Sequence, residues 1–230
     1  IGMGHTAENL AKQHSISRDE QEKMALESHQ KAASATDKNK FEDEIVSING
    51  VTKDGCIRPE TSLESMSGLK PAFDKDGVVT AATSSPLTDG AAAVIVCSED
   101  YANKNSLEIL AHIRGMAISG CSPEIMGIGP VLSSQKALKR AGLKLEDVDV
   151  IEMNEAFAAQ SLACVKELGV EMSKLNIHGG AISMGHPLGA SGARITGKAA
   201  SLLKETGKRY ALSTMCVGGG QGCATVLERV

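Results

Sequence analysis

From residue 106 to the C-terminus, segments patterned like β-strands alternate with segments patterned like α-helices. Strands are expected over residues 106–119, 148–153, 209–216 and 223–230, and helices over 130–142, 156–169 and 188–206. Pro130 stands at the start of the first helix, and Gly142 and Gly169 follow the ends of the first two. Strands that alternate with helices favour a layered α/β fold around a central sheet.

The first part of the chain has a different pattern, with helices first and irregular chain after them. We expect a short helix over residues 6–14 and a second helix that opens at Ser17, because Glu20 completes the spacing of a capping box. The stretch 41–77 is interrupted by glycines and prolines, and only residues 44–48 resemble a strand. This part predicts an α-rich, loop-rich module with little core of its own.

The composition changes at Val78, where a polar turn leads into a continuous apolar run over residues 91–97. Short apolar runs bounded by turn residues are typical of buried strands, so we expect a strand there. A helical or turn linker is expected over residues 100–105.

Charge and composition exclude several classes of protein. The formal net charge of −4 argues against an electrostatic nucleic-acid binder. Aromatic residues make up only 2% of the chain, which removes base-stacking platforms. No run approaches the roughly 18 apolar residues that a membrane span needs, and no signal or transit segment is recognised. The six cysteines form no C-x-x-C pair, so we expect reduced thiols rather than a zinc or redox site.

Polar residues directly follow two predicted strands, at the place where α/β folds put their sites. Asn154 opens the sequence NEAFA after strand 148–153, although helix capping alone would explain an Asn and a Glu there. Cys216 ends strand 209–216 and is followed by the glycine run 218–220. A hairpin turn beside a buried thiol would explain this run. Exposed N–H groups of the same glycines could instead bind a developing oxyanion, next to a thiol kept reactive.

His186 lies between Gly185 and Pro187, in the sequence GGAISMGHPLGASGAR. A lone histidine is more often structural than catalytic, but a histidine held in a rigid Gly/Pro loop before a helix is a candidate base. A phosphate-binding interpretation of these glycine-rich loops fails, because neither G-x-G-x-x-G nor a Walker pattern is present.

Taken together, these motifs resemble the thiolase family, in particular the 3-ketoacyl-CoA thiolases and acetyl-CoA acetyltransferases. The resemblance covers essentially the whole chain, through MGHTAENLAKQHSISRDEQ, LKPAFDKDGVVTAATSSPLTDGAAA, EIMGIGP, NEAFAAQ, GGAISMGHPLGASGARI and CVGGGQG. It implies a layered α-β-α-β-α sandwich. Residues 1–76 would form a loop (cap) domain, 77–106 the end of the N-terminal core half, and 107–230 a complete C-terminal core half.

The resemblance implies acyl transfer, by thiolytic cleavage of 3-ketoacyl-CoA or by the reverse Claisen condensation. His186 resembles the histidine that activates the nucleophilic cysteine, and Cys216 resembles the acid/base cysteine that exchanges the α-proton. Gly218 would offer its N–H to one oxyanion site, and Asn154 would hold a water in the other. Coenzyme A is the implied substrate, without a further cofactor or a metal, and the implied partner is a second copy in a homodimer or homotetramer. The cytoplasm is the expected compartment, with the mitochondrion or peroxisome open for a eukaryotic source.

The resemblance also implies which residues of this chain contact coenzyme A and the acyl group. Arg58 matches an arginine near the adenine and phosphate end. For Arg58 and Ser65 a solvated loop is an equally good explanation. The remaining matches line the pantetheine tunnel and the reacting acyl end: Ser65, Phe73, Ala81 and Ser85 for the tunnel, Met126 and Phe157 for the acyl end.

Two departures from the family pattern matter. The family's nucleophilic cysteine lies in a C-[AS]-S-G context that none of the six cysteines has, and Cys121 in SGCSPE lies in the wrong place. We therefore expect a C-terminal portion of a thiolase that is inactive alone. Gly2 stands where acetoacetyl-type thiolases tend to carry a histidine, which favours the degradative group. The alternatives are a non-catalytic thiolase-like acyl-CoA-binding protein and a folded structural fragment. Ketoacyl synthases share the fold but are discounted, because they typically carry a second histidine where this chain has Asn154.

Overall fold

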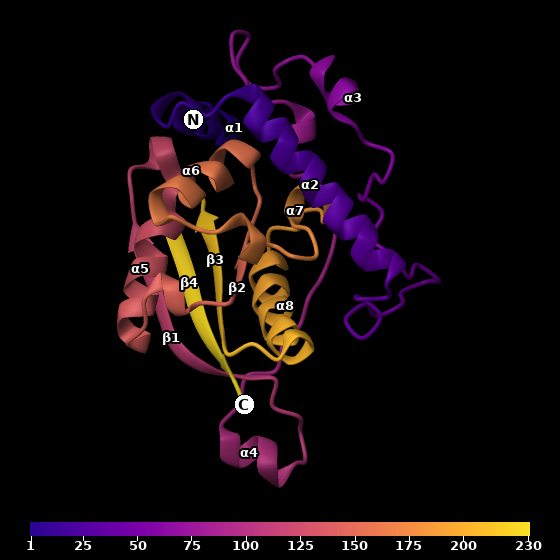
Figure 1. Ribbon diagram of the computed structural model, residues 1–230, viewed down its shortest axis with the longest axis vertical. Helices are drawn as coiled ribbons and strands as arrows, with labels where there is room; N and C mark the ends of the chain where they lie inside the picture. The colour runs from indigo at the N-terminus through magenta and orange to yellow at the C-terminus, as the bar shows by residue number, and fades with distance from the viewer.

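The computed structural model describes residues 1–230 and is built around one four-stranded sheet (Figure 1). The strand order is β1 (Ala111–Gly120), β4 (Gln221–Arg229), β3 (Tyr210–Val217) and β2 (Val150–Met153). β4 pairs antiparallel with both β1 and β3, and β2 pairs parallel with β3. A parallel pair needs a crossover, and here the chain between β2 and β3 provides helices that cover the sheet.

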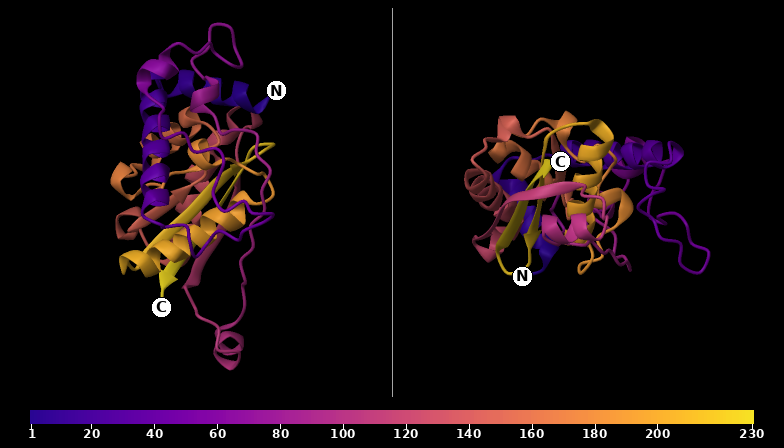
Figure 2. Two further views of the ribbon diagram at one scale, coloured as in Figure 1. Left: turned by 90° about the vertical axis from the view of Figure 1, so that its right-hand side faces the viewer. Right: turned by 90° about the horizontal axis from the view of Figure 1, so that it is seen from below.

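Helices cover both faces of the sheet (Figure 2). α5 (Gly129–Ala141) packs on β1 and β4, and α8 (Ser191–Thr206) packs on β2 and β3. Adjacent residues of β3 contribute to the cores on opposite faces of the sheet. Leu212 belongs to the hydrophobic cluster that includes residues of α5, and Ala211 belongs to the cluster that includes residues of α8. α6 (Ala158–Leu168) lies next to α5 and closes the end of the sheet.

Two N-terminal helices pack above the carboxyl end of β2 and β3. α1 (Met3–Gln13) packs on α6, and α2 (Arg18–Asp37) runs along α6 and the short helix α7 (Ala181–Met184). The Ser17 side chain accepts from the Glu20 N–H while the Glu20 carboxylate accepts from the Ser17 N–H, so the predicted capping box is confirmed.

The remaining elements are short. They are α3 (Leu63–Ser67), α4 (Glu99–Lys104) and the 3₁₀ turns Ala81–Thr83, Pro123–Ile128, Leu145–Asp147 and Met172–Lys174. No helix combines the length and the apolar character needed to cross a membrane.

Two strand predictions are wrong. Residues 91–97 belong to no strand, and Ile95 and Val96 are 80% and 72% exposed. An apolar run becomes a buried strand only when a sheet edge accepts it, and the sheet of this chain ends at β1 and β2. Residues 44–48 contribute only an isolated bridge between Ile48 and Val51.

The other strands and helices are confirmed, with shifted boundaries. The strand expected from residue 106 begins at Ala111, and the helix expected from residue 188 begins at Ser191. Gly142 and Gly169 adopt left-handed conformations, with φ of +71° and +74°, at the ends of α5 and α6. All six cysteines are free thiols, as expected. The division into three domains stays a prediction.

Candidate active site

Asn154 and Cys216 lie at the carboxyl ends of β2 and β3. These two ends form the same edge of the sheet, because the strands are parallel neighbours. Met153 pairs with Thr214, and the Asn154 N–H donates to the Thr214 carbonyl at 3.0 Å. Cys216 follows near the end of β3, and both side chains are buried. The parallel register therefore brings together a polar amide and a thiol that are far apart in the sequence.

His186 joins this edge through the loop between α7 and α8. Its Nε2 lies 3.3 Å from Nδ2 of Asn154, and its Nδ1 lies 2.6 Å from Oγ of Ser191. The Ser191 hydroxyl donates to the Pro187 carbonyl, so it is free to accept the proton on Nδ1. This network is satisfied when Nδ1 carries the proton and the lone pair on Nε2 accepts from the Asn154 amide. An imidazole with its lone pair on Nε2 is in the form of a base.

Burial pushes the pKa values of the two titratable groups in opposite directions. Burial, and then the nearby Arg194 guanidinium, lower the pKa of His186 below its ordinary value. Burial raises the pKa of Cys216 to about 12. At neutral pH the histidine is therefore uncharged and able to accept a proton, and the cysteine is a thiol able to donate one.

The glycine run forms the hairpin turn between β3 and β4. Gly220 has a φ of +94°, and a Cβ built on it would overlap the carbonyl oxygen of Cys121, so this position requires glycine. The Gly218 N–H is exposed and has no acceptor in the protein. The hairpin interpretation is thus confirmed. The Gly219 and Gly220 N–H groups of the turn likewise have no acceptor in the protein. The role of Gly218 as an oxyanion donor stays a prediction.

The residues matched to the acyl end surround Cys216. Met126 and Phe157 are buried in the same apolar cluster as Cys216. Phe73 packs edge-on against Phe157, with ring centroids 5.7 Å apart. Ser85 holds the same region, because its N–H donates to the Ala156 carbonyl.

A cavity of about 400 Å³ brings together three of the residues matched to coenzyme A. Arg58, Ser65 and Ala81 line it from three separate segments, together with His29 of α2 and Ile182 of α7. Phe73 and Ser85 lie outside its lining. The Arg58 side chain is exposed and forms no hydrogen bond within the protein. It is therefore available to a ligand phosphate.

Glu155 supports the site and was not singled out from the sequence. Its carboxylate is buried and accepts from the Ser28 hydroxyl at 2.7 Å, the Asn176 amide at 2.7 Å and the Ile182 N–H at 3.2 Å. These bonds tie α2 to the segment that precedes His186. The NEAFA motif contained this residue, but nothing in the sequence pointed to Ser28 as its partner.

No cysteine of the chain is bonded to His186, whose partners are Asn154 and Ser191. The Cys164 thiol is buried and donates to the Gly127 carbonyl, and Cys97 is exposed on the unpaired run 91–97. The Cys121 thiol is directed to the Met126 carbonyl at 3.7 Å. The described residues thus place no thiol within hydrogen-bond distance of His186, the candidate base.

The sequence of the chain matches two family models. The family model described as "Thiolase, C-terminal domain" matches residues 107–229, and "Thiolase, N-terminal domain" matches residues 1–100. The chain belongs to the thiolase family. The resemblance inferred from the sequence and the thiolase fold are thereby confirmed.

Thiolases from distant sources resemble the chain over its whole length. The 3-ketoacyl-CoA thiolase of Vibrio parahaemolyticus is 53% identical across 99% of this chain. The crystal structure of human mitochondrial 3-ketoacyl-CoA thiolase in complex with CoA covers all of it, with a TM-score of 0.98 and 48% identity. The Bacillus anthracis acetyl-CoA acetyltransferase also covers all of it, with a TM-score of 0.95 and 42% identity.

The chain spans only part of each of these thiolases. It covers 61% of the Vibrio protein, 59% of the human chain and 60% of the Bacillus chain. The family therefore follows from the comparisons, while activity and substrate need an argument from the site.

Proposed function

We propose that this chain supplies the acid/base machinery and part of the coenzyme A site of a thiolase that acts on 3-ketoacyl-CoA. The observation that carries the proposal is the convergence of Asn154, His186 and Cys216 at one sheet edge. The cavity lined by Arg58, Ser65 and Ala81 supports coenzyme A as the ligand. The relatives' names, 3-ketoacyl-CoA thiolase among them, support the same substrate class.

The protonation states fit the thiolytic direction. An enzyme thiolate, deprotonated by His186, adds to the 3-keto carbon, and the bond between C2 and C3 breaks. The electron pair passes to the enolate of acetyl-CoA, and the Cys216 thiol protonates its α-carbon. The acyl group then moves from the enzyme thiol to the thiol of a second CoA, whose proton returns to Cys216. In this scheme the Gly218 N–H stabilises one oxyanion, and a water held by Asn154 stabilises the other.

The same residues would run the condensation in reverse, with the Cys216 thiolate removing the α-proton of acetyl-CoA. The raised pKa of Cys216 makes the thiol the resting form, which favours its use as an acid first. Homodimer or homotetramer formation, and location in the cytoplasm, mitochondrion or peroxisome, stay predictions from the resemblance.

We expect the isolated 230-residue chain to bind CoA and to leave 3-ketoacyl-CoA uncleaved, because none of its thiols is placed on His186. Isothermal titration calorimetry with CoA and an assay of acetoacetyl-CoA cleavage test both parts. If the unaltered chain cleaves acetoacetyl-CoA much faster than its His186→Ala variant, the expectation that the chain lacks a nucleophile is wrong. Absence of CoA binding by a folded chain would favour a structural fragment.

A chimera tests the catalytic assignment. In it, this chain replaces the matching 61% of the Vibrio parahaemolyticus thiolase. We expect the chimera to cleave 3-ketoacyl-CoA and its His186→Ala variant to lose at least about 100-fold in kcat. A chimera that binds CoA but does not cleave the substrate would favour the non-catalytic acyl-CoA-binding alternative.

A further inference from the structure

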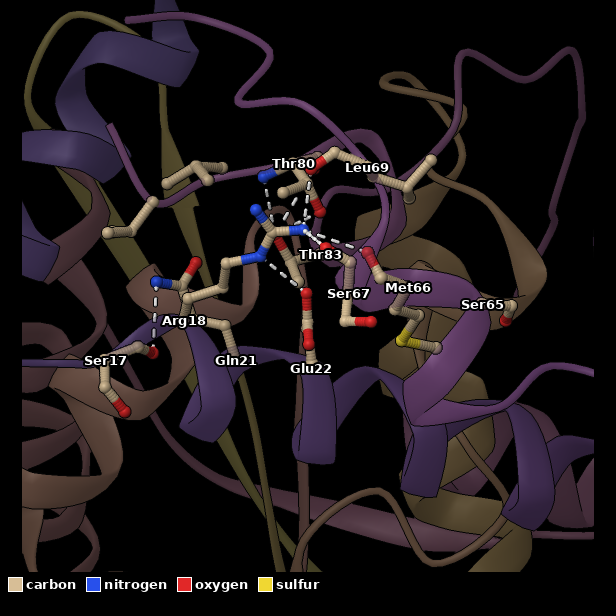
Figure 3. Close-up of polar contacts among 12 residues, drawn as sticks. Ser17, Arg18, Gln21, Glu22, Ser65, Met66, Ser67, Leu69, Thr80 and Thr83 are labelled. Atoms are coloured by element: carbon tan, nitrogen blue, oxygen red, sulfur yellow. Dashed lines mark hydrogen bonds and ion pairs between the residues drawn. The ribbon is translucent and has the colours of Figure 1, made fainter. Parts of the chain in front are cut away.

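Arg18, the first residue of α2, holds the end of α3 with its guanidinium (Figure 3). Its Nη2 donates to the carbonyls of Met66 at 2.9 Å, Ser67 at 3.1 Å and Leu69 at 2.7 Å. Its Nε donates to Oε1 of Glu22 at 2.7 Å. One side chain thus gathers three backbone carbonyls against the start of α2.

These bonds are the only polar connection between residues 59–70 and the part of the protein outside residues 58–70. Every other hydrogen bond of this segment stays between residues 58 and 70, including the capping bonds between Ser62 and Ser65. A helix of five residues has little stability of its own. Besides Arg18, the segment is anchored by the Met66 side chain, which is only 2% exposed.

The segment that Arg18 holds is a wall of the large cavity. Ser65, Met66 and Leu69 all line it. A second part of the lining is also attached to α2: Nδ1 of His29 accepts from the Arg58 N–H at 3.1 Å, and both residues line the cavity. α2 is therefore hydrogen-bonded to two parts of the cavity lining, the region of α3 and the loop at Arg58.

Arg18 is itself held in place. The side chain of Glu22 is 6% exposed, and that of Arg18 is 25% exposed, so the ion pair is partly shielded from water. α2 also packs against the turn Ala81–Thr83. Ala81 of this turn lines the cavity as well.

We propose that Arg18 is a positioning residue that holds residues 65–69 as a fixed wall of the cavity and thereby sets the affinity for coenzyme A. The proposal rests on the proposed function, which makes the cavity a coenzyme A site. A preformed wall spares the ligand the entropy cost of ordering it. The guanidinium suits this role because its fixed fork serves a carboxylate and several carbonyls at once, which a lysine ammonium does not.

The experiment compares Arg18→Met and Arg18→Lys with the unaltered 230-residue chain. We expect the Kd for CoA, from titration calorimetry, to rise about 10-fold or more in Arg18→Met and less in Arg18→Lys. Hydrogen exchange at the Met66 and Leu69 amides should accelerate at least about 10-fold in Arg18→Met, while β3 keeps its protection. Saturating CoA should restore the lost protection, because ligand binding and wall order are linked.

Arg229→Met is the matched control, because the Arg229 guanidinium also donates to a backbone carbonyl, that of Lys208, away from the cavity. It should leave both the Kd and the exchange of residues 65–69 unchanged. If Arg18→Met does not fold, Glu22→Gln tests the same interaction, because it weakens the bond that orients the Arg18 guanidinium. The Kd for CoA is then expected to rise about 2-fold to 5-fold.

Either of two results overturns the proposal: an unchanged Kd in Arg18→Met, or unchanged exchange at Met66 and Leu69. An unaltered chain that does not bind CoA would count against the proposed function and against any role in affinity. The exchange measurement would then still decide whether Arg18 holds this segment, so the two failures are distinguishable.

Discussion

At the residue scale, burial shifts the pKa values of both members of the proposed acid/base pair, His186 and Cys216. Burial disfavours the charged form of any group, so it lowers the pKa of His186 and raises that of Cys216. Both groups are consequently uncharged near neutral pH, which is the state that a base and an acid need before the reaction begins. The Asn154 amide and the Ser191 hydroxyl then fix the direction of the imidazole.

Ser191→Ala tests this orientation. Without its Oγ, Nδ1 of His186 loses its hydrogen-bond partner at 2.6 Å, and the ring is free to turn or to change tautomer. We expect kcat of the chimera to fall about 10-fold or more, with KM for CoA unchanged. Thr196→Ala is the control, because it removes a hydroxyl bond to Ser213 from the same helix. Equal losses in the two variants would contradict the role of Ser191.

Glu152 gives a prediction about stability and pH. Its side chain is buried on β2, Oε1 has no partner, and burial raises its pKa to about 8, although Arg194 and Lys198 partly offset this. A raised pKa means that the folded state holds the proton more tightly. The stabilisation is complete below the ordinary pKa of 4.5 and is lost as the pH rises toward 8.

Glu152→Gln removes this titration. The variant should gain free energy of unfolding relative to the unaltered chain as the pH rises from about 5 to 8, by on the order of 3 kcal/mol in total. Urea unfolding across this pH range measures the difference. Glu60→Gln, at an exposed position without hydrogen bonds, should show no such trend. A difference for Glu152→Gln that is constant with pH would show that the carboxyl is not protonated in the folded protein.

At the scale of single elements, the turn between β3 and β4 is defined by two glycines with different demands. Gly219 and Gly220 have φ values of +88° and +94°, but only a Cβ at position 220 would meet another atom, the Cys121 carbonyl oxygen. Gly219→Ala should therefore cost about 1 kcal/mol of unfolding free energy from backbone strain alone. Gly220→Ala should cost about 2 kcal/mol more, from the added overlap.

Thermal unfolding of the two variants measures this difference. The Gly220 variant should also lose more chimera activity, because the turn presents the Gly218 N–H next to Cys216. Equal costs at the two positions would contradict the close approach of the turn to Cys121.

Elements with local signals could be predicted from the sequence. α5 and α6 carry glycines that end them, α2 carries its capping box, and β2 to β4 follow from apolar patterning. Residues 91–97 were predicted wrongly, because β-propensity does not show whether a sheet edge is available. α3 has no apolar periodicity, and its position depends on Arg18, which lies far away in the sequence.

The site was predictable where motifs follow strands. Asn154, His186 and Cys216 each occupy a strand end or a Gly/Pro loop, and the parallel register of β2 with β3 brings the first and the last together. Glu155, Ser28 and Arg18 could not be recognised in the same way, because their partners are set by tertiary packing. Their contacts join α2 to loops that lie far from it in the sequence.

At the scale of the whole molecule, the sheet edge that carries Asn154, His186 and Cys216 and the cavity proposed for coenzyme A are both anchored to α2. Glu155 accepts from Ser28 near its middle, and Arg18 and His29 hold the cavity walls. The partners of His186 are Asn154 and Ser191, so the proposed reaction needs a nucleophile that these residues do not place on the imidazole. The division of chemistry between Cys216 and that nucleophile is the central claim.

Exchange of the α-protons of acetyl-CoA in D₂O tests this claim most directly, in the chimera and in its Cys216→Ala variant. The account predicts that Cys216→Ala slows deuterium incorporation at least about 100-fold. Transfer of a labelled acetyl group from acetyl-CoA to the enzyme thiol should persist in the same variant. Retained exchange together with lost acetylation would contradict the account, because Cys216 would then be the nucleophile rather than the acid/base group.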